Sequence, residues 1–153
     1  MTDLAYRRAI ESDLPFIVHL MAIDDVGDIK LDDPSDPLAP AYRDALAAIT
    51  ADPYQELYVV EHGGVPIGTF QLTFIPGLMR KGMWRGLVEG VHVSPDHRNR
   101  GYGKQMMRWA AERCRERGCG MLQLTSNKKR LDAHRFYRAL GYEQTHEGFK
   151  LFL

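Results

Sequence analysis

The sequence predicts an α/β (α+β) fold with a mixed, mostly antiparallel central sheet of six or seven strands, about four helices and one central parallel strand pair. Two observations lead to this prediction. Short apolar runs with strand-like alternation are separated by helical stretches and glycine turns. Between residues 84 and 125 a strand, a turn, a helix and a second strand follow one another, an order that produces a parallel pair. With 153 residues, the chain fits a single domain, 1–153.

The first third of the chain predicts a strand, a helix, a long loop and a short helix. Residues 4–10 alternate weakly, and Ser12 is placed to cap a helix with an apolar stripe. The helical pattern disappears from Asp24 to Pro40, where Asp and Pro are frequent, so we expect a polar loop. An alanine-rich helix is expected over about 42–51.

Three strands are predicted in the middle of the chain. The runs 57–61 and 67–74 are joined by His62-Gly63-Gly64, a typical hairpin connection. A second turn at 79–82 leads into a strand from Trp84 to Val93.

The last third predicts two helices and the remaining strands. A helix is expected from Gly103 to about Arg117, followed by a strand over 121–125. Asp132 is placed to cap a helix that runs to Leu140, and residues 142–153 contain one or two closing strands.

A turn with two glycines connects the 84–93 strand to the next helix. Gly101 and Gly103 leave the backbone bare where free amide N–H groups cluster at the helix N-terminus, which favours a bound anion. A plain structural connector is the commoner reason for paired glycines. Met106 replaces the third glycine of the dinucleotide motif, and Gln105 follows Lys104 where a P-loop needs Ser or Thr.

The net charge is zero, but charges are unevenly distributed along the chain. Residues 1–93 hold 7 Lys/Arg and 14 Asp/Glu, residues 94–140 hold 12 and 4, and residues 141–153 hold 1 and 2. The positive block begins at the glycine turn, in agreement with an anionic ligand. Some of its arginines are expected to form a solvated helix face instead. These are Arg113, Arg115 and Arg117.

Composition argues against several other classes of protein. No apolar run approaches the roughly 18 residues of a membrane span, and no signal peptide is evident, so we expect a cytoplasmic location and no membrane partner. The basic segment lacks a nucleic-acid-binding module, so no nucleic acid is expected. Cys114 and Cys119 are expected to be free thiols, and the six histidines lack metal-ligand spacing, so we expect no metal.

Two motifs resemble those of a known family. Arg98 to Gly103 form R-x-x-G-x-G directly after a V-x-V strand end, which resembles motif A of the GNAT acetyltransferases. Phe136 to Tyr142 resemble the F-Y-x-x-L-G-F/Y ending of their motif B, and the order of elements matches their fold. The resemblance implies a turn that holds the pyrophosphate of acetyl-CoA. It further implies an N-acetyltransferase that moves the acetyl group directly, in a ternary complex, to a primary amine of a small molecule.

Glu89 is the candidate general base. By the period of two, it shares a strand face with Val91 and Val93, where a carboxylate is costly unless it has a partner or a task. A structural ion pair with Arg85, which has the same parity, is an equally weighted alternative. The Glu-Gly pair is also similar to aminoglycoside-type members of the family, in which such a Glu contacts the acceptor amine. The base would act directly or through water.

Tyr137 is the candidate general acid, because the resemblance places its hydroxyl at the sulfur of the leaving thiolate. Without the family match, a core residue with a wet tip would be the better interpretation. Many members have Asn seven residues before this Tyr. Here Arg130 stands there and Asn127 lies three residues earlier, so either takes that role. The residues expected to contact the cofactor are Val91, His92, Val93, Arg98, Asn99, Arg100, Gly101, Tyr102, Gly103, Lys104, Asn127 and Arg130.

The cofactor contacts of Val91 and Val93 would be made by their backbone groups, which can pair with the pantetheine arm as with an added strand. The side chain of His92 points away from these two valines and is expected to be a satisfied structural imidazole.

The acceptor is less defined by the sequence. The acidic 24–40 loop could attract a cationic amine or be merely solvated. Trp84 and Tyr54 could wall a pocket, although a core role for Trp84 is preferred. Residues 126–137 resemble a subgroup that includes aminoalkylphosphonate N-acetyltransferases. The alternatives to an acetyltransferase are a non-catalytic acyl-CoA-binding regulatory module and a basic nucleic-acid binder. Exposed strand edges would allow a homodimer.

Overall fold

The computed structural model describes residues 4–24 and 31–153. The chain forms two compact units, Met1–Gln123 and Leu124–Leu153. Part of the predicted polar loop, with Asp25 and Asp28, lies outside the described residues.

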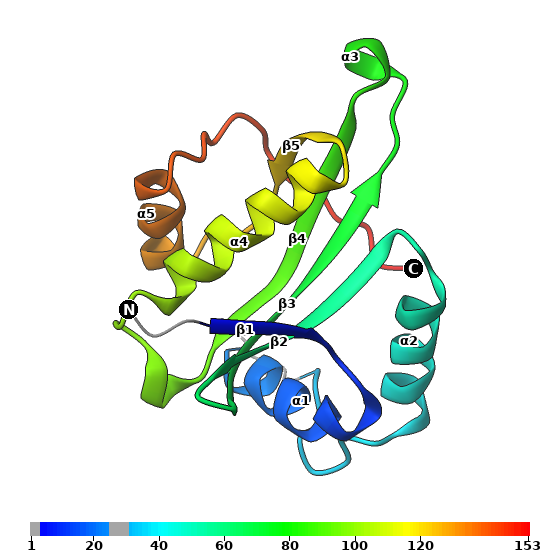
Figure 1. The fold of residues 1–153 in the computed structure, drawn as a ribbon, viewed down its shortest axis with the longest axis vertical. Coiled ribbons are helices and arrows are strands. Elements are labelled where there is room, and N and C mark those ends of the chain that lie inside the picture. The colour runs from blue at the N-terminus through cyan, green and yellow to red at the C-terminus, as the bar shows by residue number, and fades with distance from the viewer. Residues whose placement is uncertain (1–3, 25–30) are drawn as a thin grey trace. The chain divides into compact units, whose positions relative to one another are not determined.

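The first unit is built on one mixed sheet of five strands in the order β1-β2-β3-β4-β5 over the described residues (Figure 1). Strands β1 to β4 pair antiparallel, and β4 and β5 form the predicted parallel pair. The strands span Leu4–Arg8, Gln55–His62, Val65–Ile75, Trp84–Val93 and Cys119–Gln123. The sequence therefore predicted β4 with its observed bounds and the other four within a few residues.

Five α-helices are found in the described chain, four of them in the first unit. Helices α1 to α4 span Leu14–Ile23, Pro40–Ala51, Met79–Gly82 and Tyr102–Glu116, and α5 spans Leu131–Ala139 in the second unit. Two short 3₁₀ segments, Glu11–Asp13 and Pro95–His97, precede α1 and follow β4. The extra helix relative to the prediction is α3, a single turn at the tip of the β3–β4 hairpin where a turn was expected.

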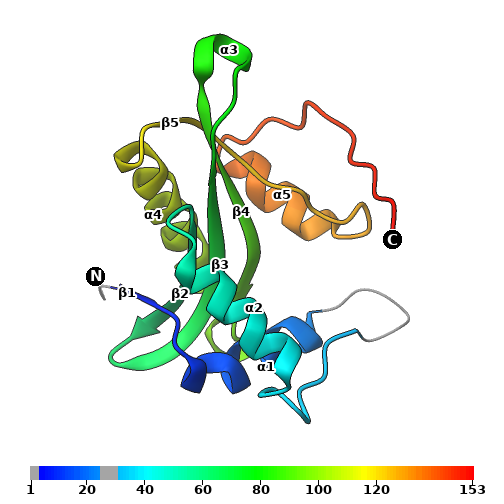
Figure 2. The same ribbon diagram turned by 90° about the vertical axis from the view of Figure 1, so that its right-hand side faces the viewer.

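The helices of the first unit cover both faces of its sheet (Figures 1 and 2). Helix α4 lies on one face, where Trp109 stacks on Tyr6 with ring centroids 4.3 Å apart and meets Tyr58 edge-on at 4.8 Å. Helices α1 and α2 pack on the opposite face. Their apolar cluster with the sheet consists of Ala9, Leu14, Ile17, Leu46 and Val59.

The closing strands predicted at the C-terminus are wrong. Residues 142–153 contain no strand, so the described sheet has five strands rather than six or seven. Phe149 and Phe152 are 94% and 86% exposed. A strand needs a neighbouring strand with which its backbone can form hydrogen bonds.

Both predicted helix caps are also wrong. Ser12 lies inside the 3₁₀ turn, and Asp13 accepts the backbone N–H of Ile10 at 2.8 Å instead. Asp13 is held in place by Arg7, which donates two hydrogen bonds of 2.7 and 2.8 Å. Asp132 lies in the first turn of α5, where it pairs with Arg135, and not at its cap.

Two of the three arginines expected on a solvated helix face are half-buried against the sheet. Arg113 donates hydrogen bonds of 2.7 and 3.0 Å to Glu56, whose residue is only 2% exposed. Arg117 lies 4.4 Å over the ring of Phe74 and contacts Glu56 at 3.4 Å. Only Arg115 is exposed as predicted. A carboxylate on β2, far away in sequence, draws the other two inward.

The two thiols lie between α4 and β5 and are free and buried, as predicted. Burial raises the pKa of Cys114 to about 12, so this thiol stays protonated and unreactive. No helix in the described chain is long and apolar enough to span a membrane.

Candidate functional site

Strand β4 has an edge that is only partly paired. Strand β5 pairs with β4 along Trp84 to Leu87 and no further. Beyond Leu87, the described residues provide a strand partner only on the β3 side. The outward-facing N–H and C=O groups of residues 88–93 are therefore left for another extended molecule.

A β-bulge lies in this same part of β4. Glu89 pairs with Gln71 and His92 with Thr69, so two residues, Gly90 and Val91, stand opposite the single residue between Gln71 and Thr69. Gly90 has a φ of 59°, a left-handed conformation that suits glycine. The bulge re-aims every side chain that follows it.

The bulge overturns the predicted placement of Glu89 on the same face as Val93. Directly paired residues share a face, so Glu89 and His92 lie on the side of Gln71 and Thr69, while Val93 pairs with Gly68 on the α4 side. The period of two fails because the bulge inserts one residue between Glu89 and His92.

The side chain of Glu89 is exposed and has no ion pair among the described residues. The alternative of a structural pair with Arg85 is therefore not realised in the described chain. A carboxylate on an exposed strand position next to an unpaired backbone edge is accessible to a ligand.

The connection that follows β4 begins with a tightly held segment. The backbone N–H of Ser94 donates to Ile67 at 2.8 Å, and its hydroxyl is 2.8 Å from Nδ1 of His97. The N–H groups of His97 and Arg98 donate to Ser94 and Pro95 at 2.9 and 3.2 Å. These bonds close the 3₁₀ turn and fix the chain just before the glycines.

The next six backbone amides, those of residues 99–104, have no hydrogen-bond acceptor in the described part of the chain. Helix α4 makes its first backbone hydrogen bond from Gln105 to Gly101 at 3.2 Å, and no described residue accepts from the six N–H groups before it. Asn99 and Gly101 have φ angles of 60° and 80°, the left-handed conformation that also occurs in anion-binding turns. Free amides at the start of a helix, here one of 15 residues, favour a bound anion.

The side chains of this turn divide into two groups. Asn99, Arg100 and Lys104 are exposed and have no side-chain partner within the described chain. Tyr102 is buried and its ring lies 5.3 Å from the ring of His62, so it anchors the helix start. A predicted contact of Tyr102 with cofactor would therefore come from its backbone.

Arg98 is not free, because it is bound within the first unit. Its Nη2 donates to Asp24 at 2.6 Å and its Nε donates to the carbonyl of Val93 at 3.0 Å. Nδ1 of His92 donates to the other oxygen of Asp24 at 2.7 Å. His92 is thus the satisfied imidazole that the sequence predicted.

Asp24 is a site residue that the sequence analysis missed. It ends α1 and lies 68 residues before His92 and 74 before Arg98, so no local spacing marks it among the other aspartates. Burial raises the pKa of its carboxyl, but the hydrogen bonds from His92 and Arg98 outweigh burial and bring the pKa below the ordinary value.

The second unit contains the other predicted catalytic residue. Tyr137 lies in α5, with its ring edge-on to Phe136 at 5.1 Å and to Tyr142 at 5.8 Å. Gly141, with a φ of 91°, ends the helix, and the N–H of Tyr142 returns to the carbonyl of Tyr137 at 3.1 Å. Burial raises the pKa of Tyr137 and Arg130 partly opposes this, so the phenol is protonated at neutral pH.

Asn127 and Arg130 differ in how far their side chains are engaged within this unit. The side-chain oxygen of Asn127 accepts the N–H of Lys129 at 2.9 Å, and its carbonyl accepts from Arg130 and His134. Arg130 is at the N-cap of α5, and its guanidinium has no ion pair among the described residues.

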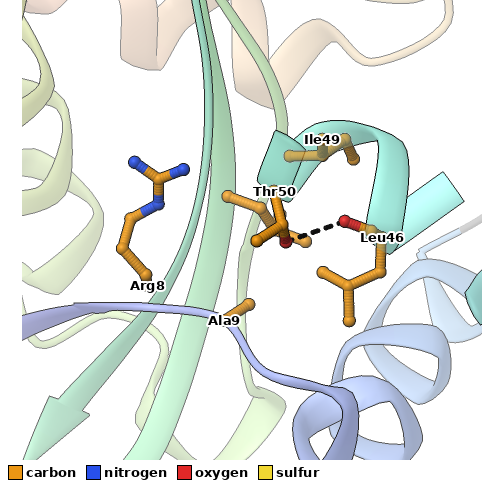
Figure 3. Close-up of a pocket in the computed structure, with 6 residues that line it drawn as sticks. Arg8, Ala9, Leu46, Ile49 and Thr50 are labelled. Carbon is orange, nitrogen blue, oxygen red and sulfur yellow. Dashed lines mark hydrogen bonds between the residues drawn. The ribbon is translucent and has the colours of Figure 1, made fainter. Parts of the chain in front are cut away.

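One hollow lies elsewhere in the first unit, between the end of β1 and α2 (Figure 3). Its volume is about 120 Å³, and the Thr50 hydroxyl that faces it already donates to Leu46 at 2.8 Å. Ligand pockets are typically at least about 300 Å³, so this hollow is too small for a nucleotide-sized ligand. No cluster of three metal-ligating side chains occurs in the part of the chain that the structure describes.

The chain matches a known protein family over most of its length. Residues 23–142 match the Acetyltransferase (GNAT) family. The chain belongs to this family. GNAT proteins are N-acetyltransferases that use acetyl-CoA as the acetyl donor. The predicted enzyme class and the predicted cosubstrate are therefore confirmed.

Relatives of this GNAT protein cover most or all of its length. It is 34% identical over 109 residues to an aminoalkylphosphonate N-acetyltransferase of Salmonella typhimurium, over 71% of this chain and 70% of the relative. A crystal structure of a transcriptional regulator from Bacillus halodurans superimposes with a TM-score of 0.91 and 41% identity, covering 99% of this chain and 100% of the other. An aminoglycoside N-acetyltransferase in complex with CoA shares the fold, with a TM-score of 0.75, 17% identity and coverage of 100% and 96%.

Proposed function

We propose that this GNAT protein transfers the acetyl group of acetyl-CoA directly to a primary amine of a small molecule, within a ternary complex. The observation that carries the proposal is the row of six free backbone amides, 99–104, at the N-terminus of α4. A diphosphate presents several acceptor oxygens, and this row supplies donors for them without using side chains.

The donor would lie along β4 and the turn that follows it. Backbone groups of Val91 and Val93, on the partly paired edge of β4, would bond the pantetheine arm as an added strand bonds a sheet. Arg100 and Lys104 are exposed and would add positive charge around the phosphates. Arg130 is the better candidate than Asn127 for the additional contact in motif B, because the Asn127 side chain already bonds Lys129.

Two side chains would handle the protons of the reaction. Glu89 would take a proton from the acceptor ammonium, directly or through water, so that the neutral amine can attack the thioester carbonyl. As the C–N bond forms and the C–S bond breaks, Tyr137 would give its phenolic proton to the leaving sulfur, and the proton that the nitrogen then loses would restore the phenol. Tyr137 holds its proton at neutral pH, as a general acid must before the reaction.

The class of acceptor is supported by similarity and by charge. The relative from Salmonella typhimurium is an aminoalkylphosphonate N-acetyltransferase, so a short amine that carries an anionic group is the first candidate acceptor. The exposed Glu89 carboxylate suits the cationic amine of such a molecule. A cytoplasmic location and a single domain over 1–153 stay predictions of the sequence.

A regulatory protein that binds acyl-CoA without turnover is the second candidate. It is favoured by the transcriptional regulator from Bacillus halodurans, which is 41% identical. The two functions differ in one measurable property, the release of free CoA in the presence of an amine.

The deciding experiment is a thiol-release assay with acetyl-CoA and a panel of amino acids, polyamines, aminoglycosides and aminoalkylphosphonates, together with calorimetric titration of acetyl-CoA. Binding with turnover supports the enzyme. Binding without turnover on any amine favours the regulatory protein. Absence of both binding and turnover would reject the coenzyme A site itself.

A further inference from the structure

Asp24 joins three parts of the first unit through one carboxylate. It ends α1, one of its oxygens accepts from His92 on β4 at 2.7 Å, and the other accepts from Arg98 in the turn at 2.6 Å. The side chain of Asp24 is only 12% exposed, and that of His92 is 11% exposed. This carboxylate is therefore a half-buried structural contact and not a mobile surface charge.

These contacts fix the segment that carries the free amides. Arg98 immediately precedes residues 99–104, and its side chain folds back to the carbonyl of Val93, the last residue of β4. Asp24 holds the same guanidinium through Nη2. The start of the amide row is thus tied to both β4 and α1 before any ligand arrives, which reduces the ordering cost of binding.

The guanidinium still has one nitrogen to offer. Nε and Nη2 of Arg98 are bonded to Val93 and Asp24, but Nη1 has no partner among the described residues. The Arg98 side chain is 43% exposed. A guanidinium is a planar fork of five donors, so it can be held at one edge and bind phosphate with another.

We propose that Asp24 is a positioning residue of the donor site, which holds Arg98 and the turn so that the 99–104 amides and Nη1 of Arg98 meet the CoA diphosphate together. This inference rests on the proposed function. It assigns a role in donor binding to the C-terminal end of α1, an element outside both recognised motifs.

The direction in which the Kd for CoA changes when the Asp24 carboxylate is removed separates this role from a simple charge effect. Removal of a carboxylate near a polyanion's site should tighten binding if the charge only repels the phosphates. Removal of a positioning carboxylate should weaken binding, because Arg98 and the turn lose their fixed geometry. Asp24→Asn keeps the shape of the side chain and changes its charge, so the two effects act in opposite directions.

The experiment is calorimetric titration of CoA into the wild-type protein, Asp24→Asn, Arg98→Lys and the double variant. We expect Asp24→Asn to raise the Kd for CoA about tenfold, within the range of measured coupling between sites. Arg98→Lys should give a similar loss, since a lysine cannot hold Asp24, Val93 and a phosphate at once. The double variant should be no weaker than either single variant.

Asp44→Asn, on an exposed residue of α2, is the matched control for loss of one negative charge and should leave the Kd within about twofold of wild type. An unchanged or lower Kd in Asp24→Asn would overturn the proposal. Additive effects in the double variant would also overturn it. If Asp24→Asn fails to fold, Arg98→Lys alone decides, with an unchanged Kd as the contrary result. Wild-type protein that does not bind CoA would instead reject the proposed function.

Discussion

The buried carboxylate of Glu56 accepts two hydrogen bonds from the guanidinium of Arg113, at 2.7 and 3.0 Å, and thereby fastens α4 to β2. Tyr58 donates a third bond at 2.7 Å. Since α4 begins at the free amides of the turn, this pair also fixes the helix whose N-terminus is the proposed phosphate site.

Loss of one partner should destabilise the fold. Arg113→Met removes both bonds and leaves Glu56 with weaker contacts, so we expect the free energy of unfolding to fall by about 2 kcal/mol. Urea denaturation followed by circular dichroism measures this loss. Arg115→Met, on the exposed side of the same helix, is the control and should change stability by less than about 0.5 kcal/mol. Equal effects in the two variants would contradict the stabilising contact between Arg113 and the sheet.

The same carboxylate should make stability depend on pH. Burial raises the pKa of Glu56, but bonds from Arg113 and Tyr58 outweigh burial and lower the pKa below its ordinary value. A lowered folded pKa contributes stability that is complete above the unfolded pKa of about 4.3 and is lost as pH falls through the folded pKa. The stability difference between wild type and Glu56→Gln should therefore shrink as the pH is lowered from about 6 to 3. A difference that does not vary over this range would show that Glu56 keeps an ordinary pKa.

A negative charge at the turn should abolish donor binding. Gly101 has a φ of 80°, and no atom lies within 4 Å of the place that a Cβ would take, so a side chain has room but the backbone favours glycine or asparagine. Gly101→Asn introduces the backbone strain without a charge. Gly101→Asp introduces a side chain of nearly the same shape that carries a negative charge next to the phosphates. We expect the Asp variant to bind CoA at least about tenfold more weakly than the Asn variant. Equal Kd values in calorimetry would mean that the amide row does not bind the diphosphate.

Removal of the Tyr137 hydroxyl should slow turnover without affecting the binding of the acetyl donor. Tyr137→Phe keeps the ring contacts with Phe136 and Tyr142, so kcat should fall about 100-fold while the Kd for CoA stays near the wild-type value. Tyr142→Phe removes a neighbouring hydroxyl and serves as the control. A kcat in Tyr137→Phe equal to that of wild type would remove the acid role.

Glu89→Gln should change the pH dependence of the reaction. If Glu89 accepts the ammonium proton, its loss lowers kcat/KM for the amine by about 100-fold, and activity recovers as the pH approaches the pKa of the free amine. The exposed position of Glu89 makes a folding defect unexpected. Equal losses at all pH values would point to a binding role in place of proton transfer.

The elements around the glycine turn could be predicted from sequence because their signals are local. Strand β4 alternates and ends before a Pro, and α4 begins at a glycine with a positive φ. The free thiols and the satisfied imidazole of His92 also follow from residue type. For the strand and the helix, neighbours in the sequence determine the outcome.

The errors arise where distant residues decide. Arg113 and Arg117 were expected in solvent because the helical pattern does not show that Glu56 lies buried on the opposing strand. Asp24 resembles any loop aspartate until the fold brings it to Arg98. One or two closing strands were expected over residues 142–153, yet these residues find no strand to pair with in the described chain.

The bulge at Gly90 also means that the sheet face on which each later residue of β4 lies depends on the number of residues in the strand. A substitution at Gly90 would cost only the strain of its left-handed backbone, because no atom crowds the site. Deletion of the residue would restore strict alternation, send His92 to the opposite face of the sheet and separate it from Asp24. This stretch of the chain should therefore tolerate substitutions far better than insertions or deletions.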